Sequence, residues 1–224
     1  MNVELEALSE VMRKLQRDTV GDPIWIDEKG VFEYPEKSIE IVVILKLVRA
    51  VHGLHAMSLL CKSGLFIDMS AIWRCVNDCN NEVYFLLENY PNRSSNVEKF
   101  VKEFFSKTID NYLSADEEPV LNKKILNAYA RVLSGKEQDE EAKQTIYRIY
   151  KTNSGYIHAS YAHIMEMFGG SSPSFNLSGI PSQVQVSNRM AIVEAARISI
   201  AQAIAFVAQK FGKWELYKDA KKCC

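Results

Sequence analysis

Two long apolar helices joined by a very short turn constrain the fold of this chain more than any other feature. Residues 36–62 and 66–90 both carry apolar side chains at helical spacing, and only Ser63, Gly64 and Leu65 separate them. Glycine commonly ends a helix, and a connection of this length leaves two helices side by side and antiparallel. The sequence therefore predicts an antiparallel helical hairpin.

The rest of the chain shows the same helical spacing, with two exceptions. Further helices are expected at 3–17, 95–113, 119–133, from about 137 towards Phe168, and at 188–211. Residues 24–34 hold two short β-rich runs around a glycine-containing turn, and this pattern predicts a small hairpin. Residues 171–187 hold two prolines and predict an irregular loop or a second hairpin. The prediction is one all-α domain over residues 1–224, a bundle of six or seven helices. Residues 213–224 add a last amphipathic turn or form a loose C-terminal tail.

Composition and charge limit the environment and the partners. The chain is 47% hydrophobic and 25% charged, as expected for a globular protein with one core. The net charge of -1 supplies no global basic field, so a nucleic-acid partner needs a local patch. The most apolar run, 39–51, is interrupted by charges and is shorter than the roughly 20 residues that span a bilayer. With no secretion signal in the acidic N-terminal residues, we expect a cytoplasmic protein without membrane contact.

The five cysteines form neither a disulfide framework nor a zinc-binding pattern. Cys75 and Cys79 lie one helical turn apart, but no second pair accompanies them. We therefore interpret the internal cysteines as small buried thiols and predict neither a metal site nor a cofactor.

A polar run inside an otherwise apolar helix gives the first candidate site. It consists of Arg74, Asn77, Asp78 and Asn81. Arg74 and Asp78 are four residues apart and so share one face of the helix. Burying a charge costs several kcal/mol unless the charge finds a partner. The run is therefore either a structural ion pair that fixes the bundle or the floor of a pocket in which Arg74 binds an anion.

The second candidate site lies in the later helix, where Ser154, His158 and Tyr161 follow one another at offsets of four and three. An imidazole beside hydroxyl groups is able to act as a general acid or base, and Asp78 of the other helix is the carboxylate expected to orient it. Gly155 weakens the helix and indicates a kink or the close approach of another backbone. Catalysis, ligand binding and a merely polar core are all compatible with this pattern.

Two further features have a structural and a functional interpretation. His52 and His55 are three residues apart, which suits either a shared metal or two helix-surface histidines; the carboxylate spacing of a zinc protease is lacking. The helix at 188–211 is rich in alanine, which permits close packing either in the core or across a subunit interface.

Two short patterns give a family resemblance. Arg74-Cys75-Val76-Asn77-Asp78 is similar to an Arg-Ser-Leu-x-Glu pattern, with Cys for Ser and Asp for Glu, and Ser154-Gly155-Tyr156-Ile157-His158 is similar to Ser-x-x-x-His. Together they resemble a group of uncharacterised bacterial helical proteins. The resemblance covers residues 45–90 and 145–170. It implies an α-bundle in which Arg74, Asp78 and His158 gather in one polar centre.

Such bundles also resemble the HEPN class of helical domains. Many HEPN ribonucleases use an arginine followed four to six residues later by a histidine, and two copies build one metal-independent site. Arg49 and His55 have that spacing, whereas Arg148 stands too far from His158. The resemblance implies a ribonuclease of stress or phage defence, with His158 or His55 as the acid–base group and Arg74 or Arg49 at the phosphate.

We thus expect a non-enzymatic interaction or regulatory module that forms a homodimer, with a structural polar centre. The alternatives are the HEPN-like ribonuclease, which would bind RNA, and a small anionic-ligand binder with Arg74 as its anchor.

Overall fold

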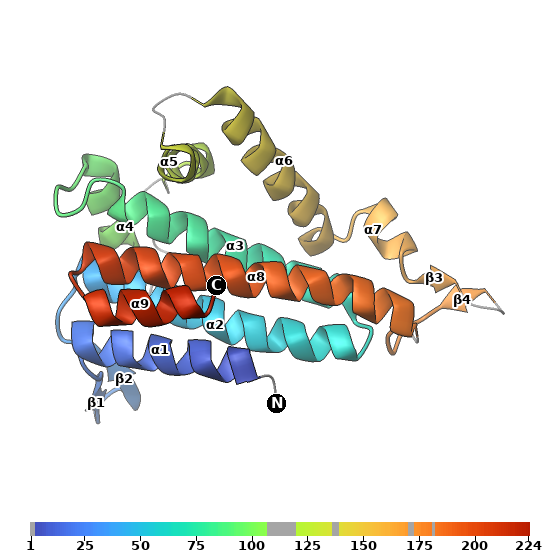
Figure 1. Cartoon of the computed structure of the whole chain (residues 1–224), viewed down its shortest axis with the longest axis horizontal. Coiled ribbons are helices and arrows are strands. Elements are labelled where there is room, and N and C mark those ends of the chain that lie inside the picture. The colour runs from blue at the N-terminus through green and yellow to red at the C-terminus, as the bar shows by residue number, and fades with distance from the viewer. Residues whose placement is uncertain (1–2, 107–119, 136–138, 170–172, 181) are drawn as a thin grey trace.

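The computed structural model describes residues 3–106, 120–135, 139–169, 173–180 and 182–224. The protein is mostly helical, with 74% of the described residues in helices, and two small two-stranded hairpins lie beside the helices (Figure 1). The predicted all-α fold class and both predicted excursions from it are confirmed.

The centre of the molecule is formed by three long helices. α2 (Ile39–Lys62) and α3 (Phe66–Leu87) form the predicted hairpin, and α8 (Gln183–Lys210) packs against both. Ser38 caps the start of α2 by accepting a hydrogen bond from Ile41 N at 3.3 Å. Gly64 forms the turn after α2 with φ of +71°, a conformation that side chains with a Cβ disfavour. The short turn keeps α2 and α3 in contact along their lengths.

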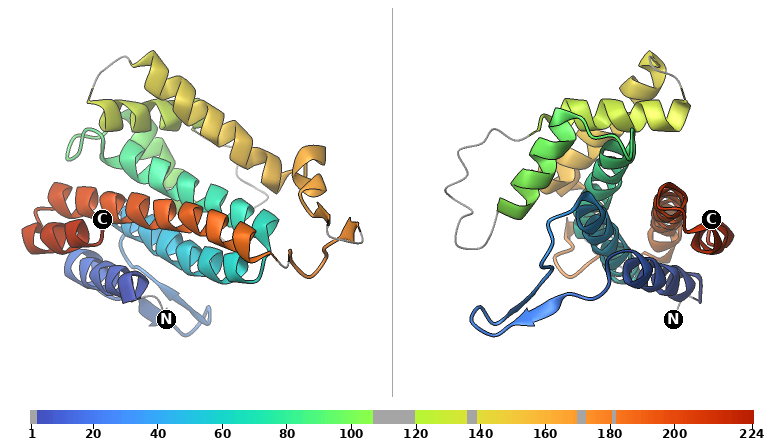
Figure 2. Two further views of the ribbon diagram at one scale, coloured as in Figure 1. Left: turned by 45° about the vertical axis from the view of Figure 1, so that its right-hand side comes forward. Right: turned by 90° about the vertical axis from the view of Figure 1, so that its left-hand side faces the viewer.

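Smaller helices cover this centre on several sides. α1 (Val3–Val20) packs on α2, and α9 (Trp214–Lys222) packs on α8 and α1. On the other side, α5 (Asn122–Ser134) and α6 (Glu140–Ile157) pack on α3, while α4 (Ser95–Ser106) contacts α2. Figure 2 shows α5 and α6 on the face of the bundle opposite α1. α3 therefore lies between two groups of helices, with α2 and α8 on one side and α5 and α6 on the other.

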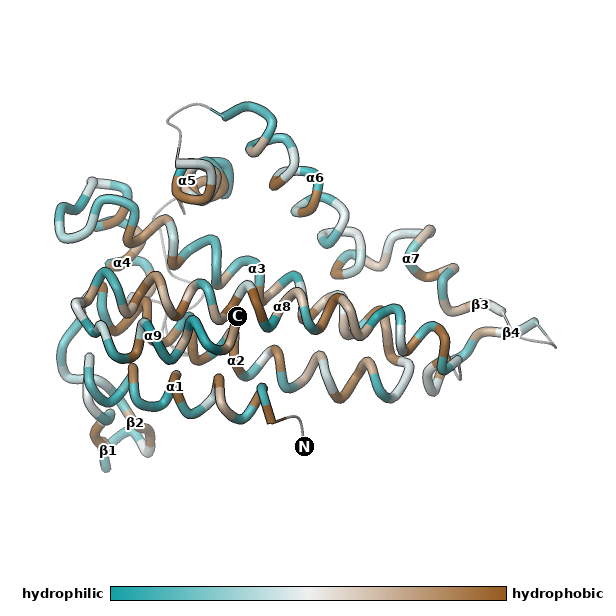
Figure 3. Tube along the Cα trace, viewed as in Figure 1, coloured by the Kyte–Doolittle hydropathy of each residue, from teal (hydrophilic) through white to brown (hydrophobic). Residues whose placement is uncertain are grey.

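The core lies where α1, α2, α3 and α8 meet. Leu8, Leu47, Met57, Leu86 and Ile204 are fully buried there. Figure 3 shows apolar residues, with polar ones between them, on α8 and on the visible part of α2. By length and composition these two helices are apolar enough to cross a membrane, but a helix in the middle of a core has the same composition. Most of the alanines of α8 are buried, so core packing accounts for them: Ala196, Ala201, Ala203, Ala205 and Ala208.

Both hairpins are antiparallel and short. β1 (Ile24–Ile26) pairs with β2 (Val31–Glu33), with Trp25 opposite Phe32. β3 (Phe168–Gly169) pairs with β4 (Ser174–Phe175), with Phe168 opposite Phe175.

Two predicted helix boundaries were wrong. The helix expected to run from 137 towards Phe168 ends at Ile157, because Ala159 has a φ of +49°, and a separate short helix α7 (Tyr161–Met165) follows. α8 begins at Gln183 rather than 188, since Ser182 caps it. Of the two alternatives predicted for residues 213–224, the structure shows the amphipathic helix, because α9 buries Leu216 and Ala220. The second half of the helix expected at 95–113 lies outside the described residues.

Candidate functional site

Arg74 and Asp78 form the ion pair that their spacing predicted, and Tyr150 of α6 completes the cluster. Arg74 Nη2 lies 3.1 Å from Asp78 Oδ1. The guanidinium carbon lies 3.5 Å from the centroid of the Tyr150 ring, and Nη1 donates to the Tyr150 carbonyl at 3.4 Å. The Arg74 side chain is only 7% exposed, whereas that of Asp78 is 40% exposed. The arginine is thus enclosed by its partners and presents little surface to a ligand.

Asp78 has an unusual protonation equilibrium. Burial raises the pKa of its carboxyl group from 3.8 to about 6, although Arg74 opposes this shift. Glu82, one turn further along α3, also raises that pKa, while Lys46 of α2 lowers it. Lys46 is itself held by Glu82, with Nζ 2.6 Å from Oε2. Two positive and two negative side chains are therefore close together here: Arg74, Asp78 and Glu82 of α3, and Lys46 of α2.

The contact between α3 and α6 leaves some polar groups unsatisfied. Arg74 Nε, Asn77 Nδ2 and Asn153 Nδ2 are buried donors without an acceptor among the described residues. Asn77 is one turn from Arg74, and Asn153 is one turn from Tyr150. A buried unsatisfied donor costs about 1–3 kcal/mol. Since Asn153 is also the one buried residue of α6, we infer that this helix is held more weakly than the central three.

Asn81 of the first candidate site and the neighbouring Asn80 make no hydrogen bond with Arg74 or Tyr150 among the described residues. Asn81 is buried in α3. Asn80, which the sequence did not single out, donates from Nδ2 to Ser199 Oγ of α8 at 3.1 Å. Polar residues of α3 therefore make contacts at two interfaces, one with α6 and one with α8.

His158 does not meet Arg74 and Asp78, so the predicted centre of three groups is not formed. His158 is exposed at the end of α6 and makes no hydrogen bond or ion pair with either residue within the described chain. It lies eight residues beyond Tyr150, about 12 Å along a helix with a rise of 1.5 Å per residue. Ser154, His158 and Tyr161 do not share a face either, because the helix ends before Tyr161.

A second polar cluster, which sequence reasoning missed, joins α6, α7 and α8. Glu166 at the end of α7 accepts a hydrogen bond from Tyr156 Oη at 2.9 Å and pairs with Arg189 Nη2 at 2.7 Å. Arg189 Nη1 also lies 3.5 Å from Tyr156 Oη. The bonds with Tyr156 and Glu166 raise the pKa of Arg189, against the opposing effect of burial. Guanidinium, carboxylate and phenol from three helices thus meet here, and they join the chain segment around α7 to the bundle.

Histidine takes part in this second cluster, but it is His163 instead of His158. The His163 ring packs edge-on against Tyr156, with centroids 4.0 Å apart, and its Nδ1 hydrogen-bonds Ser160 Oγ. Gly155 makes room for this ring, since a Cβ there would lie 2.3 Å from His163 Cε1. The close approach that Gly155 predicted is therefore real, though a side chain and not a backbone approaches it.

The segment that follows α6 forms a protruding arm. We call the described residues 157–169, 173–180 and 182–184, with α7, β3 and β4, the distal arm; Figure 1 shows α7, β3 and β4 extending beyond the end of the bundle. The part of the arm that leads into α8 is hydrogen-bonded to the turn between α2 and α3, where Ile180 N donates to the Gly64 carbonyl at 3.0 Å. A Cβ on Gly179 would lie 2.2 Å from the Ser63 carbonyl, so the two backbones touch.

The distal arm exposes many large apolar side chains. Seven of them are between 38% and 80% exposed: Ile157, Tyr161, Ile164, Phe168, Phe175, Leu177 and Val184. Charge is almost absent from the same region. Between Lys151 and Arg189 the sequence holds 37 residues, and only Glu166 carries a full charge. This depletion of charge, in a chain that is 25% charged, is the sequence signal that could have located the arm.

The remaining candidates do not assemble into a site in the described chain. His55 Nε2 lies 2.9 Å from Ser9 Oγ of α1, whereas Arg49 Nη1 lies beside Gly53, which faces α3. Arg49 and His55 therefore point to different neighbours. His52 is exposed. Burial raises the pKa of Cys79 to about 12, in keeping with a buried thiol. Among the described residues, no three metal-binding side chains gather.

Comparison of the chain with family models, with curated proteins and with solved structures finds no match. The resemblances drawn from short patterns are thus supported as far as the all-helical fold and no further.

Proposed function

We propose that the protein is a non-enzymatic helical interaction module that pairs two copies of itself through the distal arm. The observation that carries this proposal is the set of seven exposed apolar side chains on one short, protruding segment. On soluble proteins, exposed apolar side chains that form a patch mark an interaction site.

The composition of the arm supports a protein interface. Interface cores are enriched in aromatic residues and methionine and depleted of charge. The arm exposes Tyr161, Phe168 and Phe175, and its carboxylate Glu166 is neutralised by Arg189. A standard interface buries about 800 Å² on each partner, and side chains of this size and number supply much of that area.

A second copy fits this surface better than a charged partner does. A two-fold dimer sets the same patch against itself, so a patch with charge of one sign would repel its own copy. The arm avoids that repulsion because it carries almost no charge. It also offers no charged groups with which to select a different partner electrostatically.

The anchoring of the arm supports binding without reorganisation. The Tyr156–Glu166–Arg189 cluster holds one end of the arm, and the contact between Ile180 and Gly64 holds the other. A surface held in place before association loses less conformational entropy when it binds. The enclosed position of Arg74, away from His158, supports a structural role for the first polar cluster.

Sedimentation equilibrium of the full chain tests the proposal. We expect a reversible monomer–dimer equilibrium, and we expect Leu177→Asp to raise the dimer dissociation constant at least about tenfold by burying an unpaired charge. Leu59→Asp is the matched control, because Leu59 is 68% exposed on α2, outside the arm, and should leave the equilibrium unchanged. A wild-type protein that stays monomeric at all concentrations would refute the proposal, as would equal effects of the two variants.

A further inference from the structure

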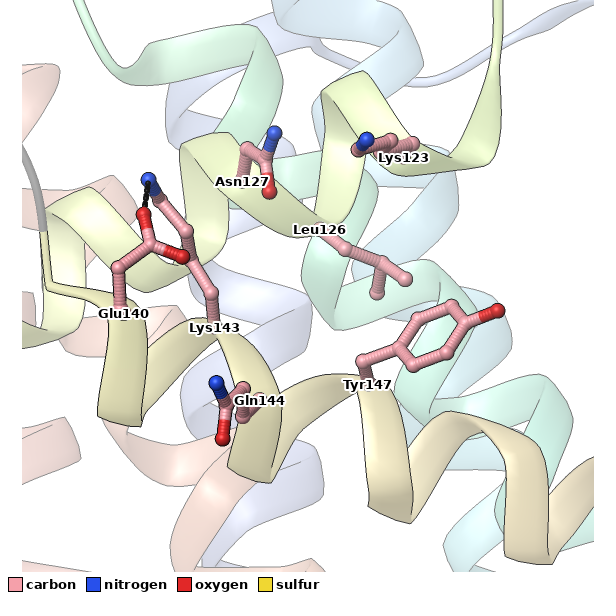
Figure 4. A pocket seen from close by; sticks show the side chains of 7 residues that line it. All are labelled: Lys123, Leu126, Asn127, Glu140, Lys143, Gln144 and Tyr147. Carbon is pink, nitrogen blue, oxygen red and sulfur yellow. Dashed lines mark hydrogen bonds and ion pairs between the residues drawn. The ribbon is translucent and has the colours of Figure 1, made fainter.

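A groove separates α5 from α6 on the face of the protein remote from α1. Its volume is about 590 Å³, within the range of small-molecule sites. Figure 4 shows the side chains that line it: Lys123, Leu126 and Asn127 of α5, and Glu140, Lys143, Gln144 and Tyr147 of α6.

One part of the groove is apolar and flat. Leu126 is buried, and the half-exposed ring of Tyr147 lies across the groove from it (Figure 4). Tyr150 lies one turn further along α6, with its ring nearly parallel to that of Tyr147 at 6.4 Å between centroids. Tyr150 is fixed in turn by Arg74 and by Asn122, which donates to its hydroxyl at 2.8 Å. The ring of Tyr147 is therefore a supported surface on which a second flat ring is able to stack.

The charges around the groove are mainly positive. Glu140 neutralises Lys143, with Nζ 2.7 Å from Oε1. Lys123 lines the groove, and Lys151 places Nζ 5.6 Å from the Tyr147 centroid. Neither of these two lysines has a carboxylate partner in the part of the chain that the structure describes. A ligand with a negative group would therefore meet two ammonium groups that no carboxylate of the described residues holds.

We propose that this groove binds a small anion that carries a flat aromatic ring. The ring lies between Leu126 and Tyr147, and the negative group faces the lysines. Asn127 and Gln144 also line the groove, and their side-chain amides are able to hydrogen-bond polar atoms of a ligand. Nucleotides and aromatic carboxylic acids share this chemistry. The inference stands independently of dimerisation through the arm.

Isothermal titration of the full chain with adenosine monophosphate, and separately with 2-naphthoate, tests the inference and distinguishes the two sources. We expect saturable one-to-one binding of at least one of them. Tyr147→Ala should weaken that binding about tenfold by removing the stacking surface. Lys123→Gln should weaken it several-fold and reduce its dependence on salt.

Tyr161→Ala and Lys221→Gln are the matched controls, since both residues are exposed outside the groove. They should bind as the wild type does. Circular dichroism melting shows whether Tyr147→Ala remains folded; if it does not, Tyr147→Leu takes its place and should also weaken binding. The inference is overturned if neither compound binds, or if a folded Tyr147 variant binds as tightly as the controls.

Discussion

The guanidinium of Arg74 lies flat against the ring of Tyr150, with 3.5 Å between the guanidinium carbon and the ring centroid. The two residues belong to α3 and α6, and their contact is a main link between the bundle and the outer layer. The Arg74 side chain is almost fully buried, whereas its carboxylate partner, Asp78, is partly open to water. Because the two partners differ in exposure, substitution of one should change the free energy of unfolding by a different amount from substitution of the other.

Arg74→Met should destabilise the protein more than Asp78→Asn does. Asp78→Asn removes a carboxylate whose charged form burial disfavours, and it keeps the contacts of Arg74 with Tyr150, so we expect a loss of about 1 kcal/mol or less. Arg74→Met removes those contacts with Tyr150 and leaves Asp78 without its counter-ion, so we expect a loss of about 3 kcal/mol. Urea denaturation of both variants measures the difference. Equal losses, or a larger loss in Asp78→Asn, would contradict this description of the pair.

Asp78 should also give the protein a specific dependence on pH. Its pKa is about 6 in the folded protein and 3.8 ordinarily, so the folded state binds the proton more tightly than the unfolded state. The contribution of this group to stability therefore falls as pH rises from about 4 to about 6 and is constant above that range. The free energy of unfolding, measured at several pH values in wild type and in Asp78→Asn, isolates this contribution. A difference between the two proteins that does not change over this range would contradict the raised pKa.

Gly53→Ala tests how closely α2 and α3 approach. A Cβ at Gly53 would lie 2.7 Å from Val76 Cγ2, and a valine in a helix has little freedom to move its methyl groups. We expect a loss of about 1–3 kcal/mol from overpacking, despite the higher helix propensity of alanine. The double variant with Val76→Ala removes the opposing methyl group and should recover part of that loss. Additive effects of the two substitutions in thermal unfolding would argue against a direct contact.

Arg189→Gln should loosen the distal arm without unfolding the bundle. It breaks the ion pair with Glu166 and weakens the contact with Tyr156, both of which lie at the base of the arm. We expect amides in α7 to exchange about tenfold faster. This change corresponds to a free energy of local opening that is lower by roughly 1.4 kcal/mol. Lys218→Gln, which breaks an exposed pair with Glu215, is the control and should leave those amides unchanged. Unaltered exchange in Arg189→Gln would mean that the cluster does not hold the arm.

The sequence was sufficient for the fold class, the central hairpin and the Arg74–Asp78 pair, because each depends on local spacing. Two residues four apart in a helix are neighbours wherever the helix packs. The partner of Arg74 on α6 was not predictable in the same way. It depends on how far two helices are shifted along each other, and the chosen candidate, His158, lies two turns beyond the actual partner, Tyr150.

The second cluster was missed for a different reason. Arg189 lies in α8, within the helix predicted at 188–211, but its partner Glu166 was expected inside a single long helix that ran from 137 towards Phe168. That helix is broken because Ala159 adopts φ of +49°, a conformation that the composition of the segment does not indicate. The missing charge between Lys151 and Arg189 was visible in the sequence, and it indicates an apolar surface without specifying where that surface lies.

Hydrogen exchange of the full chain at low and high protein concentration is the most direct test of pairing through the distal arm. At the higher concentration, amides of α7 and of the described residues 173–180 should exchange more slowly, while those of the β1–β2 hairpin should not change. Exchange in the arm that is independent of concentration, or protection confined to another surface, would contradict the account.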